Sequence, residues 1–265
     1  MRAPLAAMSE MTVPGSARKA FYVVLFVLIW QAICSFGLVS PIILASPLSI
    51  VLAVKTSGLD YLSAIPFTLF EIVVGIGAAW ILGVGAGLLI GTSRLLSVAI
   101  APILSAIFAV PLIAWYPIML IWFGLGAESK IVFGAAGGFF PIALNTITAA
   151  QSYDRNFMTL GRSLGASGLR LYWKFVLPLL LSPIIASLRI GTSFVVIGIL
   201  VSEMIASTDG IGFWISTNRT MFKTGDVYLG ILLALGACML VNWLLTVLER
   251  RAGAWRDAEL LSSGH

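Results

Sequence analysis

Charged residues are scarce in this chain. They make up 10% of its 265 residues, while 60% of the residues are hydrophobic. A soluble domain of this length carries about 25% charged residues. Together with a mean hydropathy of +1.05, this composition argues against a soluble protein and indicates a polytopic membrane protein, to which the usual relation between length and domain number does not apply.

Histidine and cysteine are nearly absent as well. The single histidine, His265, is the last residue, and the two cysteines, Cys34 and Cys238, fall inside apolar runs. These positions argue against His-based catalysis, against the usual zinc sites and against a disulfide. The sequence also lacks the G-x-x-x-x-G-K-[ST] pattern of a phosphate-binding loop, so we expect no nucleotide site of that kind in this chain.

Apolar runs are long enough to cross a bilayer at six places, since one crossing takes about 20 residues. They cover residues 20–38, 66–91, 97–123, 130–150, 182–206 and 227–248. We therefore expect an all-α polytopic membrane protein with about six transmembrane helices. The first run is about 19 residues long, longer than the apolar core of a signal peptide, and we interpret it as the first span.

Two regions depart from a simple series of spans. Residues 41–65 hold Pro41, Pro47, Lys55 and Asp60, and we expect them to form an external connection with some helix. The third run contains three prolines, at positions 102, 111 and 117. Prolines at this density kink or break a helix, which a membrane tolerates only next to a cavity or a protein neighbour. Residues of this break are therefore candidates for lining a path: Pro111, Trp115, Tyr116 and Pro117.

The distribution of lysine and arginine predicts the orientation. The net charge of +5 is spread over short loops, as orientation signals are, which argues against nucleic-acid binding. On the side of the N-terminus we count eleven cations, namely Arg2, Arg18, Lys19, Arg94, Arg155, Arg162, Arg170, Lys174, Arg250, Arg251 and Arg256. The other side has four, namely Lys55, Lys130, Arg219 and Lys223. We therefore predict that both termini and the loop at about 151–181 are cytoplasmic.

The loop at 151–181 is a basic amphipathic hairpin. Its apolar side carries Phe157, Leu160, Leu164, Leu171 and Phe175, and the other side Thr159, Arg162, Ser163, Ala166, Arg170 and Lys174, which is helical spacing. Gly165 and Gly168 interrupt the pattern, and Ser167 is a good N-cap. We expect two short helices with a bend at 165–167, the second ending at Pro178. Such a hairpin either docks on a soluble protein or lies on anionic lipid.

Ionisable and amide side chains inside the spans are candidates for function by default. Glu71, Arg189 and Glu203 fall near span ends, and we predict structural roles for Glu71 and Arg189. For Glu203 we predict a gate or a structural pairing. Gln31 and Asn145 are expected to hydrogen-bond between helices, and Asn145 is also a candidate for the path.

The hairpin resembles a known family. Gly165, followed after nine residues by Phe175 and then by Leu177-Pro178, is similar to the EAA loop of the permeases of bacterial ABC importers. The chain departs from that pattern where Glu-Ala-Ala should stand, with Thr159-Leu160-Gly161, so that a carboxylate contact is absent there. The segments PLIAWYP (111–117), WFGLG (122–126) and GIGFWI (210–215) resemble the nitrate/sulfonate/taurine branch. The resemblance covers roughly residues 40–255.

This resemblance implies a permease domain at 20–250, with cytoplasmic tails at 1–19 and 251–265. It implies that the hairpin contacts the ATPase, through Thr159, Arg162, Gly165, Ala166, Ser167, Arg170, Leu177 and Pro178, of which Gly165, Leu177 and Pro178 match the family pattern. The implied partners are a second permease copy, two cytoplasmic ATPase subunits, an extracytoplasmic binding protein and membrane lipid. ATP and magnesium would be held by the ATPase, with no cofactor in this chain.

The expected function is therefore that of the membrane subunit of an ATP-driven importer, and there are two alternatives. A stand-alone secondary transporter predicts internal repeats and mid-span carboxylates, neither of which is evident. An intramembrane enzyme needs a nucleophile–base pair or a metal cluster within the spans, and the sequence offers no internal histidine for either. The resemblance implies a small solute such as a nitrate-, sulfonate- or taurine-like anion, imported across a bacterial inner membrane.

Overall fold

The described residues form a bundle of helices. The computed structural model describes the backbone of residues 15–152 and 177–262, and the side chains of 18–152 and 180–247. Its elements are α1 (Gly15–Ser35), α2 (Pro47–Gly91), α3 (Arg94–Ala109), the short 3-10 helix η1 (Leu112–Trp115), α4 (Tyr116–Phe123), α5 (Ala127–Ser152), α8 (Leu177–Ile205), α9 (Ile211–Thr220) and α10 (Thr224–Ser262). The expectation of an all-α membrane protein is confirmed.

Within the described residues, the helices are long and apolar enough for five membrane spans, or six if the bent pair of α3 with η1 and α4 counts as one. The bend in that pair is 87° and falls at Pro111, which confirms the predicted break in the third run. Pro102 lies inside α3 without ending it. The third run is therefore interrupted at one of its three prolines.

The helix expected within residues 41–65 is present and is longer than predicted. Residues from Pro47 onward belong to α2, which continues without interruption for 45 residues into the next apolar run. The external position of this region stays a prediction. Ser46 caps its start, since its side chain accepts from the backbone N–H of Ser49, and Pro47 takes a first-turn position where no N–H is needed. Pro66 lies inside the same helix. The prolines in this region thus begin a helix or are tolerated within it.

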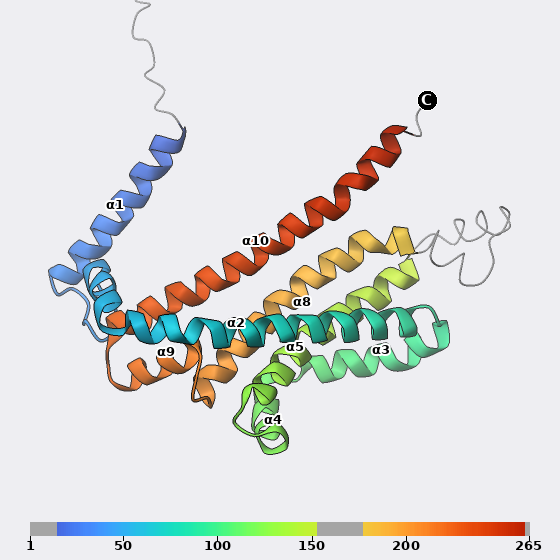
Figure 1. Ribbon diagram of the computed structural model, residues 1–265, viewed down its shortest axis with the longest axis horizontal. Coiled ribbons are helices and arrows are strands. Elements are labelled where there is room, and N and C mark those ends of the chain that lie inside the picture. The colour runs from blue at the N-terminus through green and yellow to red at the C-terminus, as the bar shows by residue number, and fades with distance from the viewer. Residues whose placement is uncertain (1–14, 153–176, 263–265) are drawn as a thin grey trace, which may run out of the picture.

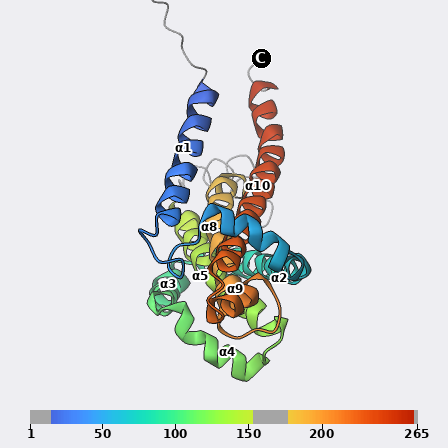
Figure 2. The same ribbon diagram turned by 90° about the vertical axis from the view of Figure 1, so that its left-hand side faces the viewer.

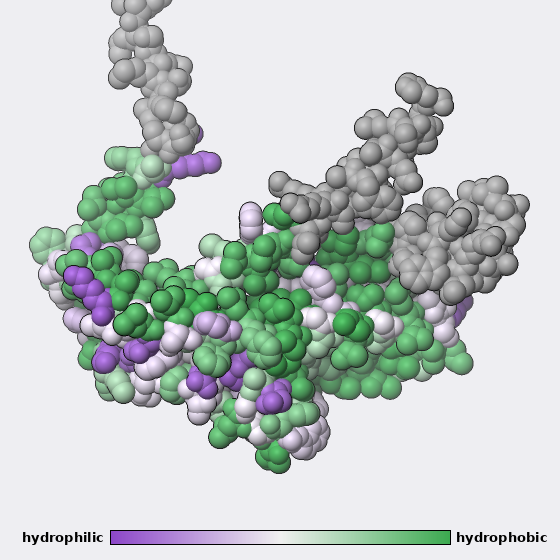
Figure 3. All heavy atoms as spheres, in the orientation of Figure 1, coloured by the Kyte–Doolittle hydropathy of each residue, from purple (hydrophilic) through white to green (hydrophobic). Residues whose placement is uncertain are grey.

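The centre of the bundle consists of α2, α5 and α8, which lie side by side, whereas α1 and the end of α10 extend away from it (Figures 1 and 2). The ends of α2, α5 and α8 at Gly91, Ser152 and Leu177 meet at one end, which we call the hairpin end. The opposite end, where α8 passes into α9, we call the turn end. Apolar residues cover much of the visible surface, and hydrophilic ones gather toward the turn end (Figure 3).

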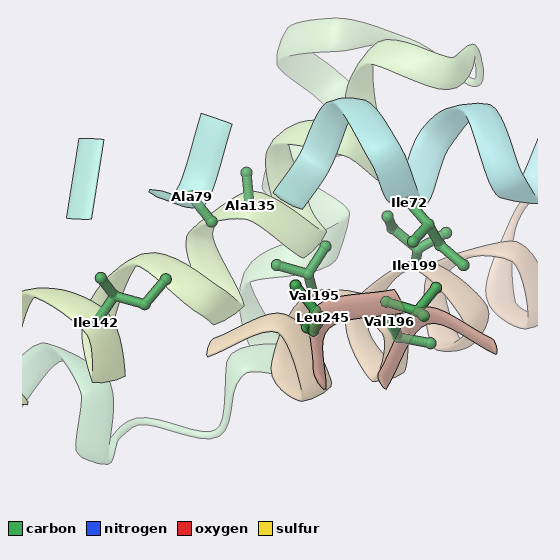
Figure 4. Close-up of a cluster of buried hydrophobic side chains, with 9 residues drawn as sticks. Ile72, Ala79, Ala135, Ile142, Val195, Val196, Ile199 and Leu245 are labelled. Atoms are coloured by element: carbon green, nitrogen blue, oxygen red, sulfur yellow. The ribbon is translucent and has the colours of Figure 1, made fainter. Parts of the chain in front are cut away.

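Aliphatic side chains from four helices fill the space between them. Ile72 and Ala79 of α2, Ala135 and Ile142 of α5, Val195, Val196 and Ile199 of α8, and Val241 and Leu245 of α10 form one buried cluster (Figure 4). Between these side chains, glycines allow the backbones to approach closely, as is common in membrane bundles. A Cβ added at Gly83 would lie 2.8 Å from Ile142, and one at Gly138 would lie 2.8 Å from the Gly191 carbonyl oxygen.

The glycine contacts yield a test of packing. A Cβ at Gly87 would lie 2.5 Å from Thr146 Cβ and 3.0 Å from the Ala143 carbonyl oxygen, and backbone atoms cannot easily give way. We expect Gly87→Ala to lower the free energy of unfolding by about 1–3 kcal/mol, the usual cost of overpacking, measured by thermal unfolding in detergent.

The matched control lies half a turn away on the same helix. At Gly85 an added Cβ would have no neighbour within 4 Å. Because alanine favours a helix over glycine by about 1 kcal/mol, Gly85→Ala should leave the unfolding temperature unchanged or raise it. Equal unfolding temperatures for the two variants would contradict the proposed packing of α2 on α5.

Candidate functional site

A cavity of about 500 Å³ lies between α5 and α8 at the hairpin end. Four polar residues line it together with five apolar ones, namely Asn145, Thr148, Ser152 and Ser187 with Ala149, Leu180, Pro183, Ala186 and Ile190. Three of the polar residues come from α5 at spacings of three and four, which places them on one face of that helix. Among these lining residues none is charged, so the cavity is polar without carrying a fixed charge.

The hydroxyl groups of this cavity donate to the backbone of their own helices. Thr148 Oγ1 donates to the Leu144 carbonyl oxygen at 2.9 Å, and Ser152 Oγ donates to that of Thr148 at 2.6 Å. Ser187 Oγ donates to the Ile184 carbonyl oxygen at 2.7 Å. Such bonds are usual for hydroxyls in helices. The hydroxyl oxygens are left as acceptors, and the exposed amide of Asn145 contributes N–H donors.

A second polar site lies at the turn end. Thr68 and Glu71 come from α2, Lys130 from α5, Glu203 from α8 and Ser207 from the segment between α8 and α9; we call these five residues the turn cluster. The first four are at most 3% exposed. Four separate parts of the chain therefore bring their polar side chains to one buried place.

Hydrogen bonds and one ion pair connect the turn cluster. The Lys130 ammonium pairs with the Glu71 carboxylate and donates to Ser207 Oγ at 3.0 Å. Thr68 Oγ1 donates to Glu203 Oε1 at 2.7 Å and accepts from the Ile211 backbone N–H at 2.9 Å. The backbone N–H of Gly212 donates to Glu203 Oε2 at 2.7 Å. The Glu203 carboxylate thereby satisfies the start of α9, where N–H groups have no partner within the helix.

Two glycines make this arrangement possible. Gly210 has a φ of 101°, and a Cβ there would collide with the Glu203 carboxyl group. A Cβ at Gly212 would lie 2.6 Å from Glu203 Cβ. Since only glycine adopts a positive φ without strain and leaves room for the carboxylate, the G-I-G sequence at 210–212 is explained by the contact with Glu203.

The turn cluster buries two carboxylates against one ammonium. Burying a charge is costly unless a partner and hydrogen bonds compensate it. Lys130 supplies the positive charge for the group, while Glu71 Oε2 is buried without a hydrogen-bond partner among the described residues. Lys130 is therefore the residue whose loss would leave the largest uncompensated charge. Within the described ranges, no three His, Cys, Asp or Glu side chains gather closely enough to hold a metal ion.

The predicted path residues fall into two separate groups. Pro111, Trp115 and Pro117 lie at the break between α3 and α4, whereas Asn145 lines the cavity at the hairpin end. Tyr116 is fully buried: its hydroxyl donates to the Ala206 carbonyl oxygen at 3.0 Å, and its ring lies 4.9 Å from that of Phe133. Tyr116 thus connects α4 to the segment next to the turn cluster. The path role of all five residues stays a prediction.

Most of the predicted hairpin lies outside the described residues. This applies to Thr159, Arg162, Gly165, Ala166, Ser167 and Arg170, while Leu177 and Pro178 are the first two residues of α8. Of the interhelical hydrogen bonds predicted for Gln31 and Asn145, the one at Gln31 is confirmed. Gln31 Oε1 accepts from the Leu48 backbone N–H at 3.1 Å and so joins α1 to α2.

The sequence indicates several members of the turn cluster as single residues, but it does not indicate that they lie together. A structural pairing was among the roles predicted for Glu71 and Glu203, and the bonds above confirm it for both. Lys130, counted among the four cations on the side opposite the N-terminus, lies in the first turn of α5 and is 3% exposed. The side of the membrane that it faces stays a prediction. Thr68 was missed. The glycines seven and nine residues after Glu203 are the one signal in the sequence that a side chain approaches this backbone.

The chain is similar to known transport proteins of the membrane. The profile of a family described as the binding-protein-dependent transport system inner membrane component matches residues 80–253. A putative aliphatic sulfonates transport permease, SsuC of Bacillus subtilis, is 28% identical over 235 residues, 87% of this chain and 84% of its own length. The taurine transport permease TauC of Escherichia coli is 32% identical over 145 residues, 55% and 53% of the two chains. The formylaminopyrimidine transport permease ThiX of Halalkalibacterium halodurans is 30% identical over 209 residues, 78% and 83%.

The turn cluster yields a test by charge removal. Lys130→Met keeps most of the side-chain volume but leaves Glu71 and Glu203 buried with no positive partner from α5. We expect it to lower the free energy of unfolding by about 3–5 kcal/mol, the usual effect of removing one partner of a buried pair. Thermal unfolding in detergent measures the loss.

The double variant Glu71→Gln with Lys130→Met removes both charges and should recover much of that stability. Lys55→Met, at an exposed position of α2, is the control for loss of a lysine and should change little. If the effects of Glu71→Gln and Lys130→Met simply add, the two side chains are not coupled, and the ion pair does not stabilise the fold.

Proposed function

The chain belongs to the family of binding-protein-dependent transport system inner membrane components, and on that premise we propose that it is the membrane subunit of an ATP-driven importer of a small polar solute. The observation that carries the proposal is the uncharged polar cavity between α5 and α8. These two helices are joined by residues 153–176, the segment with the EAA-like pattern. The place where a solute could sit thus adjoins the segment through which an ATPase could act.

The chemistry of the cavity fits passage better than tight binding. Conduction requires a site that holds a solute weakly enough to release it. Hydroxyl oxygens at Thr148, Ser152 and Ser187 accept hydrogen bonds, and the Asn145 amide both donates and accepts. A site without a fixed opposite charge would hold an anion only weakly. Most of the selectivity would then rest with a separate extracytoplasmic binding protein, which delivers the solute.

We propose a small anion, of the sulfonate, taurine or nitrate kind, as the solute. The support comes from the names of two relatives, which are permeases for aliphatic sulfonates and for taurine. A third relative is named for formylaminopyrimidine, so a neutral heterocycle is the competing solute class. The absence of acidic residues among the described residues that line the cavity supports the anion.

The proposed assembly has two copies of this chain, two cytoplasmic ATPase subunits that bind ATP and magnesium, and a binding protein on the outside. Asn145 and Thr148 are exposed, and polar residues at membrane depth face protein or a water-filled cavity rather than lipid. A second copy opposite α5 and α8 would complete the path. Both termini and the hairpin would face the cytoplasm of a bacterial cell.

Uptake by cells tests this function. Expressed with its ATPase and binding protein, the chain should support uptake of the solute, and expressed alone it should support none. Replacing Arg162 and Arg170 by glutamate in one variant should abolish both uptake and co-purification of the ATPase. The reason is that the hairpin would then present two negative charges where two positive ones contact the partner.

Lys55→Glu, which reverses an exposed charge elsewhere, is the matched control and should leave co-purification intact. Uptake by the chain alone would indicate a secondary transporter instead. Co-purification that survives the double arginine change would show that the hairpin does not form the ATPase contact, and would favour the alternative that it lies on lipid.

The solute class has its own test at Asn145. Asn145→Asp keeps the size of the side chain and adds a negative charge to the cavity. Two like charges about 4 Å apart repel by about 1 kcal/mol even in bulk water and by more in a protein. We therefore expect uptake of taurine or an alkanesulfonate to fall on the order of tenfold, measured with radiolabelled solutes.

Asn145→Ala, which removes the amide without adding a charge, should reduce uptake of the same anions much less. A neutral heterocycle should be affected equally by the two variants. Equal uptake of an anion through Asn145→Asp and Asn145→Ala would therefore argue that no anion passes this side chain.

A further inference from the structure

Three phenylalanine rings lie in contact in the order Phe140, Phe108 and Phe194, from α5, α3 and α8. The ring of Phe108 stacks on that of Phe140 with centroids 5.8 Å apart and an interplanar angle of 26°. It also makes an edge contact with Phe194, at 5.8 Å and 67°. Each ring comes from a different helix, and Phe108 touches both of the others. Phe108 therefore bridges the two helices that line the cavity.

The rings lie beyond the cavity, on its side toward the turn end. Phe194 is four residues after Ile190, which lines the cavity, and so lies on the same face of α8 one turn farther on. Phe140 is eight residues before Thr148, which lines the cavity from α5. Because α5 and α8 run in opposite directions between the two ends, both steps lead from the cavity toward the turn end.

The helix that carries Phe108 is lightly attached to the bundle. Ser97 is the one buried residue within α3, and the Gln151 side chain donates to its hydroxyl near the hairpin end. At its other end α3 stops at Ala109, and the chain then bends by 87° into η1 and α4. Phe108 thus lies near the end of a helix that is hydrogen-bonded to α5 near its start. This helix ends one residue after Phe108, at Ala109.

We propose that Phe108, Phe140 and Phe194 form the constriction that closes the translocation path between the polar cavity and the turn end. This proposal rests on the proposed function, since it assigns the cavity to that path. Apolar constrictions close a path by excluding water, and three phenyl rings in contact leave a polar solute no hydrogen-bonding partner. Displacement of α3 about its break would separate Phe108 from the other two rings and open the path.

Labelling of a thiol in the cavity tests the constriction. In a chain with Cys34→Ser and Cys238→Ser, Thr148→Cys places one reporter thiol on the lining of the cavity. A membrane-impermeant maleimide, added to inverted or right-side-out vesicles, should react with it from the hairpin side only. Adding Phe108→Ala should allow reaction from the opposite side, with a rate increase on the order of tenfold, because two aromatic contacts are lost.

Phe194→Ala should give the same result through the other ring contact, and it covers the case in which Phe108→Ala fails to fold. Phe67→Ala is the control, because that ring is 53% exposed on α2, and it should leave labelling one-sided. Phe108→Leu, which keeps an apolar side chain of similar size, should restore most of the closure.

The proposal is wrong if both alanine variants leave the rate from the turn side unchanged. It is equally wrong if the reporter reacts from both sides with all three phenylalanines present, or from neither. The labelling requires no ATPase, binding protein or solute. The labelling experiment can therefore contradict the constriction independently of the import function. The import function is contradicted by a different result, uptake without the ATPase.

Discussion

Close backbone contact through glycine is the constraint on which the rest of this structure depends. In a bilayer, helices gain little by burying apolar side chains against one another, so that van der Waals contact must hold them together. Gly83, Gly87 and Gly91 of α2 meet Ile142, Thr146 and Ala150 of α5, and Gly134 and Gly138 of α5 meet Gly198 and Gly191 of α8. One central helix, α5, is thereby held against neighbours on two sides.

The turn cluster is a consequence of that close packing. A lysine and two glutamates would be expensive in lipid, but the approach of α2, α5 and α8 encloses them in protein and brings each within reach of a partner. Their bonds also hold the elements next to the three central helices. Glu203 and Thr68 hold the start of α9, and Tyr116 holds α4 through the carbonyl group of Ala206. Glycine contacts and polar contacts therefore stabilise the bundle together at the turn end.

Local signals in the sequence predicted the fold class, most of the spans and the break at Pro111, because each depends on an apolar run or on the missing N–H of proline. For residues 41–65 they predicted only some helix, and they did not show that the helix is continuous with the next apolar run. The Ser46 cap and the first-turn position of Pro47 start that helix. The pairing of Glu71 with Lys130 joins residues on different helices, and a single sequence contains no signal for that distance.

The arrangement of the three central helices explains how one segment could control a distant path. Residues 153–176 join the end of α5 to the start of α8, so a displacement there acts on both walls of the cavity at once. α2 must move together with α5, because its glycines are in contact with that helix. α3 is held differently, near its start through Ser97 and at its end by Phe108. A shift of α5 and α8 would therefore change the ring contacts of Phe108 before it disturbs the core.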